Sequence, residues 1–314
     1  MTDSHISADM SNPIRQNVLD VVAGSFGGIG QVLAGQPFDT IKVRLQTQPQ
    51  LYSGTLDCIK KLIKSDGFMG LYKGTTSPLM GVGLCVSIQF FTLEHMKRSF
   101  RSKNNGLDLD NSQLFLAGSV AGLTNSVVSG PVEHIRTRLQ VQSSSIPSTS
   151  TPGNGPSSNY AGTFDAIRKI YTSHGLAGIY KGQVPTLIRE FFGYGFYFSA
   201  YEYLVQNEMK NTGRPRDQIS NIKICLFGSA AGFAMWLTCY PIDTIKSKIQ
   251  TDGFSGSKDR KYFGVVDCLR KTVRAEGIAG LFRGIVPCLL RAAPANASTF
   301  ICFEFSMRML QKYF

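Results

Sequence analysis

The sequence contains few of the residue patterns from which active sites are usually built. Its four histidines are scattered along the chain, and its seven cysteines form no CxxC pair and no zinc-type spacing. No HExxH motif, Walker loop, dinucleotide-binding fingerprint or Ser/His/Asp set is present. We therefore expect neither an enzyme nor a metal site, and we interpret the cysteines as small buried apolar side chains.

Signals for nucleic-acid binding and for a cleaved leader are also missing. The net charge is +12, but no aromatic-interleaved basic strand accompanies it, so the charge suits an anionic membrane surface better than nucleic acid. Residues 1–16 carry two aspartates against one arginine, unlike a secretory signal or an Arg-rich transit peptide. We expect no nucleic-acid partner.

What the sequence does have is one unit in three copies. The copies are PFDTIKVRLQ from Pro37, PVEHIRTRLQ from Pro131 and PIDTIKSKIQ from Pro241. In every copy an acid, two bases and a glutamine follow the proline at the same spacing. The distance between the prolines predicts a module of about a hundred residues. We place the three repeats at residues 17–104, 110–211 and 219–314.

Glycine motifs frame each copy. A Gly-xxx-Gly pair precedes each proline, and such pairs favour the close approach of helices in a membrane. An aromatic-x-Gly turn and then a Lys-Gly or Arg-Gly motif follow each copy, as in YSGTLD and DGFMGLYKG of the first repeat. The glycine pairs are Gly24 with Gly28, Gly118 with Gly122, and Gly228 with Gly232.

Hydropathy predicts the fold. Uncharged runs at residues 21–38, 75–93, 111–132 and 224–242 are each about the length of one membrane-spanning helix. Repeat symmetry adds two spans, at 181–205 and 283–310, each interrupted by charge. We predict an all-α membrane protein with six transmembrane helices in three pseudo-threefold repeats.

A short amphipathic surface helix is expected between the two spans of each repeat. In the first repeat, Ile59, Leu62 and Ile63 form its apolar side, and lysines surround the other side. Residues 143–159 are rich in Ser, Pro and Gly, a composition that cannot form a packed core. We predict that this insertion is a mobile loop.

The threefold pattern resembles the mitochondrial carrier family, which transports small metabolites across the mitochondrial inner membrane. The resemblance extends from about Val18 to the C-terminus. Because Lys and Arg crowd the loops inside each repeat, we expect those loops and their amphipathic helices on the matrix side. Both termini would then face the intermembrane space. A triplicated module needs no dimer, so we expect a monomer.

The acids and bases of the three copies predict a gate. Each acid and the base three residues later could form a local pair on one helix. With threefold symmetry, the acid of one helix can instead reach the base of the next, and the resemblance implies that this ring is the matrix-side gate with glutamine braces beneath it. The expected pairs are Asp39 with Arg136, Glu133 with Lys246, and Asp243 with Lys42, and the braces are Gln46, Gln140 and Gln250.

A second gate is expected near the far ends of the even-numbered spans. The family pattern there is an aromatic residue, an acid, and a base three residues after the acid. Glu94 has its base at Lys97, whereas Glu202 and Glu304 have none at that spacing. We predict a weak cytoplasmic gate with at most one ion pair, from Lys97.

The substrate site is expected between the two gates. Arg189 and Arg291 share one depth in their spans, where a charged side chain is costly unless it lines a wet cavity. Glu190 could simply neutralise Arg189. The resemblance instead implies that Glu190 binds the ammonium of an amino acid or carnitine while Arg291 binds its carboxylate. Gly81 and Val82 would leave the third wall uncharged.

These residues favour one substrate class over two alternatives. A carrier of dibasic amino acids would be expected to have an additional acid at the third wall. The absence of that acid disfavours an ornithine-type carrier. Gln36 precedes the first proline, where carnitine/acylcarnitine carriers have His. We predict the exchange of a small zwitterionic amino acid of the glutamate or glycine class by alternating access.

Bound lipid is the last expectation. Backbone N–H groups at helix starts bind phosphate well, and the resemblance implies three cardiolipins between the repeats but no other cofactor. The alternative is that these motifs are only turn signals. The glycines concerned are Gly54, Gly74, Gly162, Gly182, Gly264 and Gly284.

Overall fold

The computed structural model describes residues 13–104, 109–142, 160–213, 215, 218–254, 256 and 260–313. The insertion at 143–159 and residues 1–12 therefore lie outside the described part. Each repeat consists of a long helix, a short helix and a second long segment. The helices are α1 (Pro13–Thr47), α2 (Thr55–Asp66) and α3 (Thr76–Lys103), then α4 (Asn111–Val141), α5 (Thr163–Ile179) and α6 (Gln183–Thr212), then α7 (Asn221–Thr251), α8 (Val265–Glu276), α9 (Ile285–Leu290) and α10 (Ala292–Tyr313).

The last span differs from its prediction as a single helix. It is divided at Arg291 into α9 and α10. Pro294 explains the division, because proline has no N–H to donate to the carbonyl of Leu290 four residues earlier. The α5 segment is also kinked rather than continuous, because the backbone is non-helical at Gly175, where φ is 61°. Gly67 and Gly277 have the same conformation at the equivalent positions, with φ of 69° and 68°.

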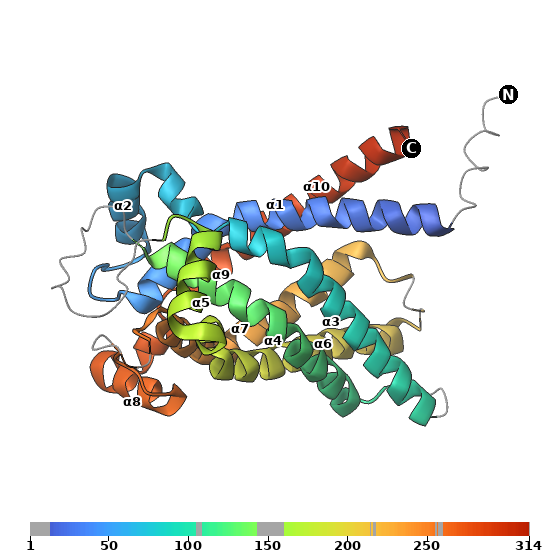
Figure 1. The fold of residues 1–314 in the computed structure, drawn as a ribbon. Coiled ribbons are helices and arrows are strands. Elements are labelled where there is room, and N and C mark those ends of the chain that lie inside the picture. Colours follow the sequence, from blue (N-terminus) through green and yellow to red (C-terminus); the bar gives the residue numbers. More distant parts are fainter. Residues whose placement is uncertain are drawn as a thin grey trace.

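The long helices form one bundle. Figure 1 shows the start of α1 and the end of α10 at one end of the bundle, and α2, α5 and α8 at the opposite end. The helix α10 packs against α1, so that the first and last repeats meet, while α4 packs between α3 and α6. Two segments, Phe68–Lys103 and Ile278–Gln311, are long and apolar enough by themselves to cross a membrane.

Large apolar side chains cover the outside of the long helices. Phe91 is 76% exposed, and Ile301 is 68% exposed. The other long helices carry similar side chains, including Phe26, Leu116, Phe192 and Leu226. So much exposed apolar surface favours contact with lipid over contact with water.

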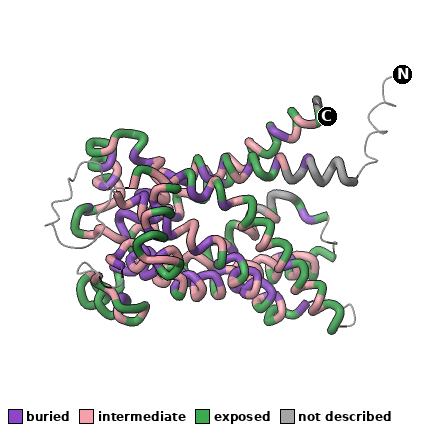
Figure 2. Tube along the Cα trace, viewed as in Figure 1, coloured by how far each residue is buried: buried purple, intermediate pink, exposed green. Residues whose placement is uncertain are grey.

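The short helices close the end of the bundle with repeated apolar clusters. In the first repeat, Ile41 of α1 packs with the fully buried Cys58 and Leu62 of α2. Ile135 with Ala166, and Ile245 with Cys268, occupy the equivalent places. Figure 2 shows buried residues inside the bundle and exposed residues on the outer faces of the short helices.

Two predictions about the surface helices and glycine pairs were wrong in part. Ile63 is 42% exposed and so does not share the buried face of Leu62, because the helix rotates it outward. A Cβ atom on Gly118 would lie 2.7 Å from the Tyr194 carbonyl oxygen, so α4 and α6 touch there. A Cβ atom on Gly24 would have nothing within 4 Å. In α1, Gly27 and Gly30 instead contact α10.

This difference between equivalent glycines gives a direct test. Gly118→Ala should lower the free energy of unfolding by about 1–3 kcal/mol, because the methyl group overlaps the α6 backbone. Gly24→Ala is the matched control at the same position of the first repeat, and it should leave the thermal midpoint unchanged or raise it slightly, since alanine is the better helix former. Equal midpoints for the two variants would contradict the predicted overlap at Gly118.

Candidate functional site

A ring of ion pairs joins α1, α4 and α7, the first long helix of each repeat. The three expected pairs between neighbouring helices are present: Arg136 to Asp39 at 2.7 Å, Lys246 to Glu133 at 2.6 Å, and Lys42 to Asp243 at 2.7 Å. The proline of each copy lies within a helix that continues past it, which carries the charges into the centre of the bundle. The ring therefore holds α1, α4 and α7 together.

The local pairing considered as an alternative forms only once. Lys246 lies 3.5 Å from Asp243 of its own helix, farther than from Glu133 of α4. Lys42 and Lys246 are nearly buried, with 8% and 7% of their side chains exposed. Weak solvent screening at these positions strengthens the attraction between the helices.

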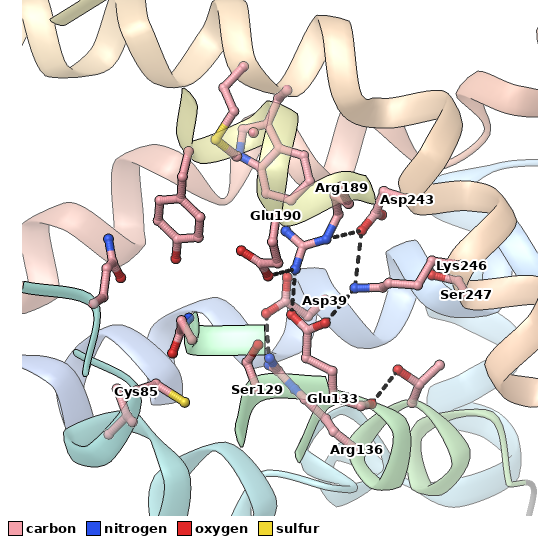
Figure 3. Close-up of a pocket in the computed structure, with 18 of the residues that line it drawn as sticks. Asp39, Cys85, Ser129, Glu133, Arg136, Arg189, Glu190, Asp243, Lys246 and Ser247 are labelled. Atoms are coloured by element: carbon pink, nitrogen blue, oxygen red, sulfur yellow. Dashed lines mark hydrogen bonds and ion pairs between the residues drawn. The ribbon is translucent and has the colours of Figure 1, made fainter. Parts of the chain in front are cut away.

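The two arginines expected between the gates reach the ring itself. Arg189 lies 2.9 Å from Glu133 and 3.8 Å from Asp243. Arg291 lies 3.2 Å from Asp39. Figure 3 shows Arg189, Glu133, Asp243 and Lys246 joined in one network. The long side chain of Arg189 spans the distance from α6 to both α4 and α7, so an arginine predicted at the substrate site also contacts the predicted gate.

Glu190 forms the interaction that was considered as its simpler alternative. One of its carboxylate oxygens, Oε1, accepts a hydrogen bond from Arg189. The other oxygen, Oε2, is buried and has no partner. The carboxylate thus neutralises part of the charge of Arg189 while one oxygen remains available to a ligand.

The three glutamines lie next to the ring and link the same helices. The amide of Gln46 donates to Thr244 Oγ1 at 3.2 Å and to Asp243 at 3.4 Å. Gln140 donates to Thr40 Oγ1 at 3.3 Å, and Gln250 accepts from Thr137 Oγ1 at 3.4 Å. The second repeat has His134 where the others have Thr40 and Thr244, and the His134 ring bonds to the Ile179 carbonyl. Gln250 therefore uses Thr137 instead.

A cavity of about 590 Å³ lies on one side of the ring. Its lining includes the ring residues, both arginines, Glu190 and Val82. Gly81 is not part of the lining, because it faces Val132 of α4, where a Cβ atom would lie 2.9 Å away. Cys85 lines the cavity and is only partly buried, so the interpretation of every cysteine as a buried side chain was wrong there. Within the described residues, no cluster of His, Cys, Asp or Glu could hold a metal ion.

Comparison with known proteins identifies the family. The model of the family described as mitochondrial carrier protein matches residues 15–104, 108–211 and 217–314. The chain belongs to the mitochondrial carrier family. Each match covers one repeat, so the threefold symmetry of the ring follows from the threefold repetition of the chain.

Several relatives of this carrier are similar over nearly their whole length. The glutamate/glycine mitochondrial carrier ymc1 of Schizosaccharomyces pombe is 46% identical over 295 residues, which is 93% of this chain and 94% of the relative. The human mitochondrial basic amino acids transporter is 40% identical, over 90% of this chain and 87% of the relative. The human mitochondrial carnitine/acylcarnitine carrier protein is 37% identical, over 96% and 97%.

The cavity of the carrier continues away from the ring. A second cavity of about 250 Å³ shares Phe90, Tyr197 and Phe198 with the first and extends to Glu94 and Glu202. The acids predicted for the second gate include two with partners on their own helices. Lys97 lies 3.9 Å from Glu94, and Arg308 lies 2.7 Å from Glu304. Arg308 was not predicted, because it lies four residues after Glu304 rather than three.

A second layer of charge under the ring was also missed. In the first repeat, the buried Arg44 and the partly buried Lys73 both lie 3.0 Å from Asp66. Lys248 and Arg283 surround Glu276 in the third repeat. The signal was present in the sequence, because the acid stands before the glycine of DGFMGLYKG and EGIAGLFRG.

The middle repeat of the carrier has no acid at that place. His174 stands there instead, and its ring stacks on Phe254 with 4.0 Å between the centroids. Arg138 and Lys181 lie over the same phenyl ring, at 4.0 and 4.8 Å. Cation–π contacts with an aromatic ring thus stand where the other two repeats have a carboxylate.

The glycines expected at lipid sites fall into two groups. Gly74, Gly182 and Gly284 have left-handed φ of 79°, 80° and 79° and lie against the first long helix of the next repeat. The other group is extended, and a Cβ atom there would have nothing within 4 Å; it consists of Gly54, Gly162 and Gly264. The first group packs repeats together, and the second leaves open space at the starts of α2, α5 and α8.

A carboxylate follows each of these open helix starts. Asp57 accepts from the Ser53 N–H and from Lys61, and the Lys61 bond lowers the pKa of the Asp57 carboxyl. Asp165 and Asp267 repeat this arrangement, and the pKa of each is lowered as well. Three exposed carboxylates outside the ring are thus available as controls for it.

Proposed function

We propose that this carrier exchanges small amino acids of the glutamate or glycine class across the mitochondrial inner membrane by alternating access. The proposal rests on the charged side chains of the cavity that are not part of the three ring pairs. Four acids and five bases line the cavity. The ring uses three of each and leaves Arg189, Arg291 and Glu190. Two guanidinium groups and one carboxylate are the complement of the two carboxylates and one ammonium of glutamate.

The alternative substrates fit this charge set less well. A basic amino acid brings a second cation, which needs another acid, and Val82 supplies none on the remaining wall. Carnitine brings a quaternary ammonium that has no N–H group to donate. The similarity to a carrier named for glutamate and glycine supports the same choice.

Contacts with the ring supply the coupling between binding and transport. A substrate carboxylate that binds Arg189 competes with Glu133, and one that binds Arg291 competes with Asp39. Because a ligand shifts a conformational equilibrium only by its differential affinity, this competition is what weakens the ring. A change from 1:99 to 99:1 takes about 5.5 kcal/mol. Two or three charge-assisted hydrogen bonds at about 1.5–3 kcal/mol each are enough.

The basic loops of each repeat indicate how the carrier is oriented in the membrane. The ring faces the matrix, because the basic loops of each repeat lie on that side. Both termini then face the intermembrane space, and the cavity of this structure opens toward them.

The carrier works as a monomer, since its three repeats complete the ring within one chain. Cardiolipin phosphates bind at the open helix starts beside Gly54, Gly162 and Gly264.

Thermal unfolding and liposome exchange test the function. Glutamate, glycine, ornithine, carnitine and pyruvate are each added to the purified protein. A ligand present at 100 times its Kd stabilises the folded state by about 2.7 kcal/mol, which raises the unfolding midpoint. We expect a rise with glutamate and glycine and their uptake into loaded liposomes. A rise only with carnitine or only with ornithine would assign the carrier to that alternative, and a response to pyruvate alone would contradict the role of Glu190.

A further inference from the structure

Two polar side chains of α4 line the central cavity without any hydrogen-bond partner. Asn125 is 3% exposed and Ser129 is 8% exposed. Asn125 Oδ1 and Ser129 Oγ are buried and make no hydrogen bond. Because the two residues are four apart on a helix, their side chains lie on one face, one turn from each other.

Neighbouring polar groups on the same helix are satisfied. The Thr124 hydroxyl donates to the Val120 carbonyl at 2.9 Å, and the Ser126 hydroxyl donates to the Leu123 carbonyl at 2.7 Å. Ser126 also accepts from the Gln183 amide at 3.2 Å. Unpaired buried polar atoms are uncommon in proteins and call for an explanation. Among the described residues of α4, such atoms belong to Asn125, Ser129 and Arg136, and all three residues line the cavity.

The close contact between α4 and α6 brings these groups to the level of Glu190. A Cβ atom on Gly122 would lie 2.6 Å from the Glu190 carbonyl oxygen. Asn125 follows Gly122 by about one turn of helix. Glu190 lines the same cavity, and its Oε2 atom also has no partner. Two touching helices therefore supply three oxygen atoms that can accept a hydrogen bond and have no partner.

We propose that Asn125 and Ser129 complete, with Glu190, a binding site for the primary ammonium of the substrate. A primary ammonium has three N–H donors and no acceptor, which matches three unpaired oxygens. A trimethylammonium has no N–H to give, and its usual partners are aromatic faces. Asn125, Ser129 and Glu190 present oxygen atoms rather than an aromatic face. The α4 pair thus selects primary over quaternary ammonium, an inference that rests on the proposed function.

A methylation series measures this selection. Inhibition of glycine exchange in liposomes is compared for glycine, N-methylglycine, N,N-dimethylglycine and N,N,N-trimethylglycine, which lose one N–H at each step. In the unmodified carrier we expect roughly a tenfold weakening at each loss of a bond. Ser129→Ala and Asn125→Leu should each weaken glycine by roughly tenfold and flatten the series, because an acceptor is gone. Asn125→Asp keeps an acceptor and should keep the series steep.

Thr124→Val is the matched control. It removes a hydroxyl from the same helix, but the Thr124 side chain is exposed and bonds to its own backbone. Equal inhibition by glycine and trimethylglycine in the unmodified carrier would overturn the inference and leave the proposed function standing. The inference would also be overturned if Thr124→Val flattened the methylation series as much as Ser129→Ala does. Absence of both glycine and glutamate exchange in the unmodified carrier would overturn the proposed function and the inference with it.

Discussion

Arg189→Gln is expected to nearly abolish exchange and to destabilise the carrier. Arg189 contacts Glu133, Glu190 and Asp243, so its removal leaves three carboxylates facing one another in a poorly hydrated centre. Breaking a buried pair in this way lowers the free energy of unfolding by about 3–5 kcal/mol. Loss of its bond to the substrate carboxylate costs about 2–5 kcal/mol, which is roughly 30-fold to several-thousandfold in affinity. Exchange rates in liposomes and unfolding midpoints measure the two effects.

Arg291→Gln is the control that separates binding from stability. Arg291 contacts only the carboxylate of Asp39 among the described ion pairs, and 27% of its side chain is exposed. The fall in the midpoint should therefore be smaller than for Arg189→Gln, while exchange should still fall strongly. Arg189→Lys keeps a cation but not the guanidinium fork, so it should recover stability better than exchange. Full exchange in Arg189→Gln would remove this arginine from the substrate site.

The second large effect is expected from neutralising the acids of the ring. The triple variant Asp39→Asn, Glu133→Gln, Asp243→Asn removes all three ion pairs between α1, α4 and α7. The matrix side should then stay open, because a loss of about 5.5 kcal/mol is enough to invert a 99:1 equilibrium. We expect uncoupled efflux of preloaded substrate from liposomes and loss of strict exchange.

A second triple variant controls for the loss of three carboxylates. This variant combines Asp57→Asn, Asp165→Asn and Asp267→Asn at the starts of α2, α5 and α8. Each of these acids forms an ion pair with a lysine of its own helix. Exposed pairs of this kind contribute about 0.3–0.5 kcal/mol each, so exchange should stay coupled. Normal exchange by the ring variant would show that the ring does not close the matrix side.

The sequence alone determined the repeat, the elements and the partners in the ring. Three copies in one register restrict the fold to threefold symmetry, and uncharged runs of sufficient length define the helices. The uncharged run predicted from Asn111 begins at the first residue of α4, and the helix continues past the end of that run to Val141. The ring pairs were predictable because threefold symmetry brings the acid of each copy within reach of the base of the next copy.

Only the tertiary structure decided how the symmetry is broken. In the folded chain Gly81 lies against Val132 while Val82 lines the cavity, and Arg189 extends from the substrate site to Glu133 of the ring. It also leaves Asn125 without a partner while the nearby Ser126 has one. Repeat symmetry predicts equivalent positions, but it does not predict which long side chain reaches across a helix contact. That depends on distances between helices that are far apart in the chain.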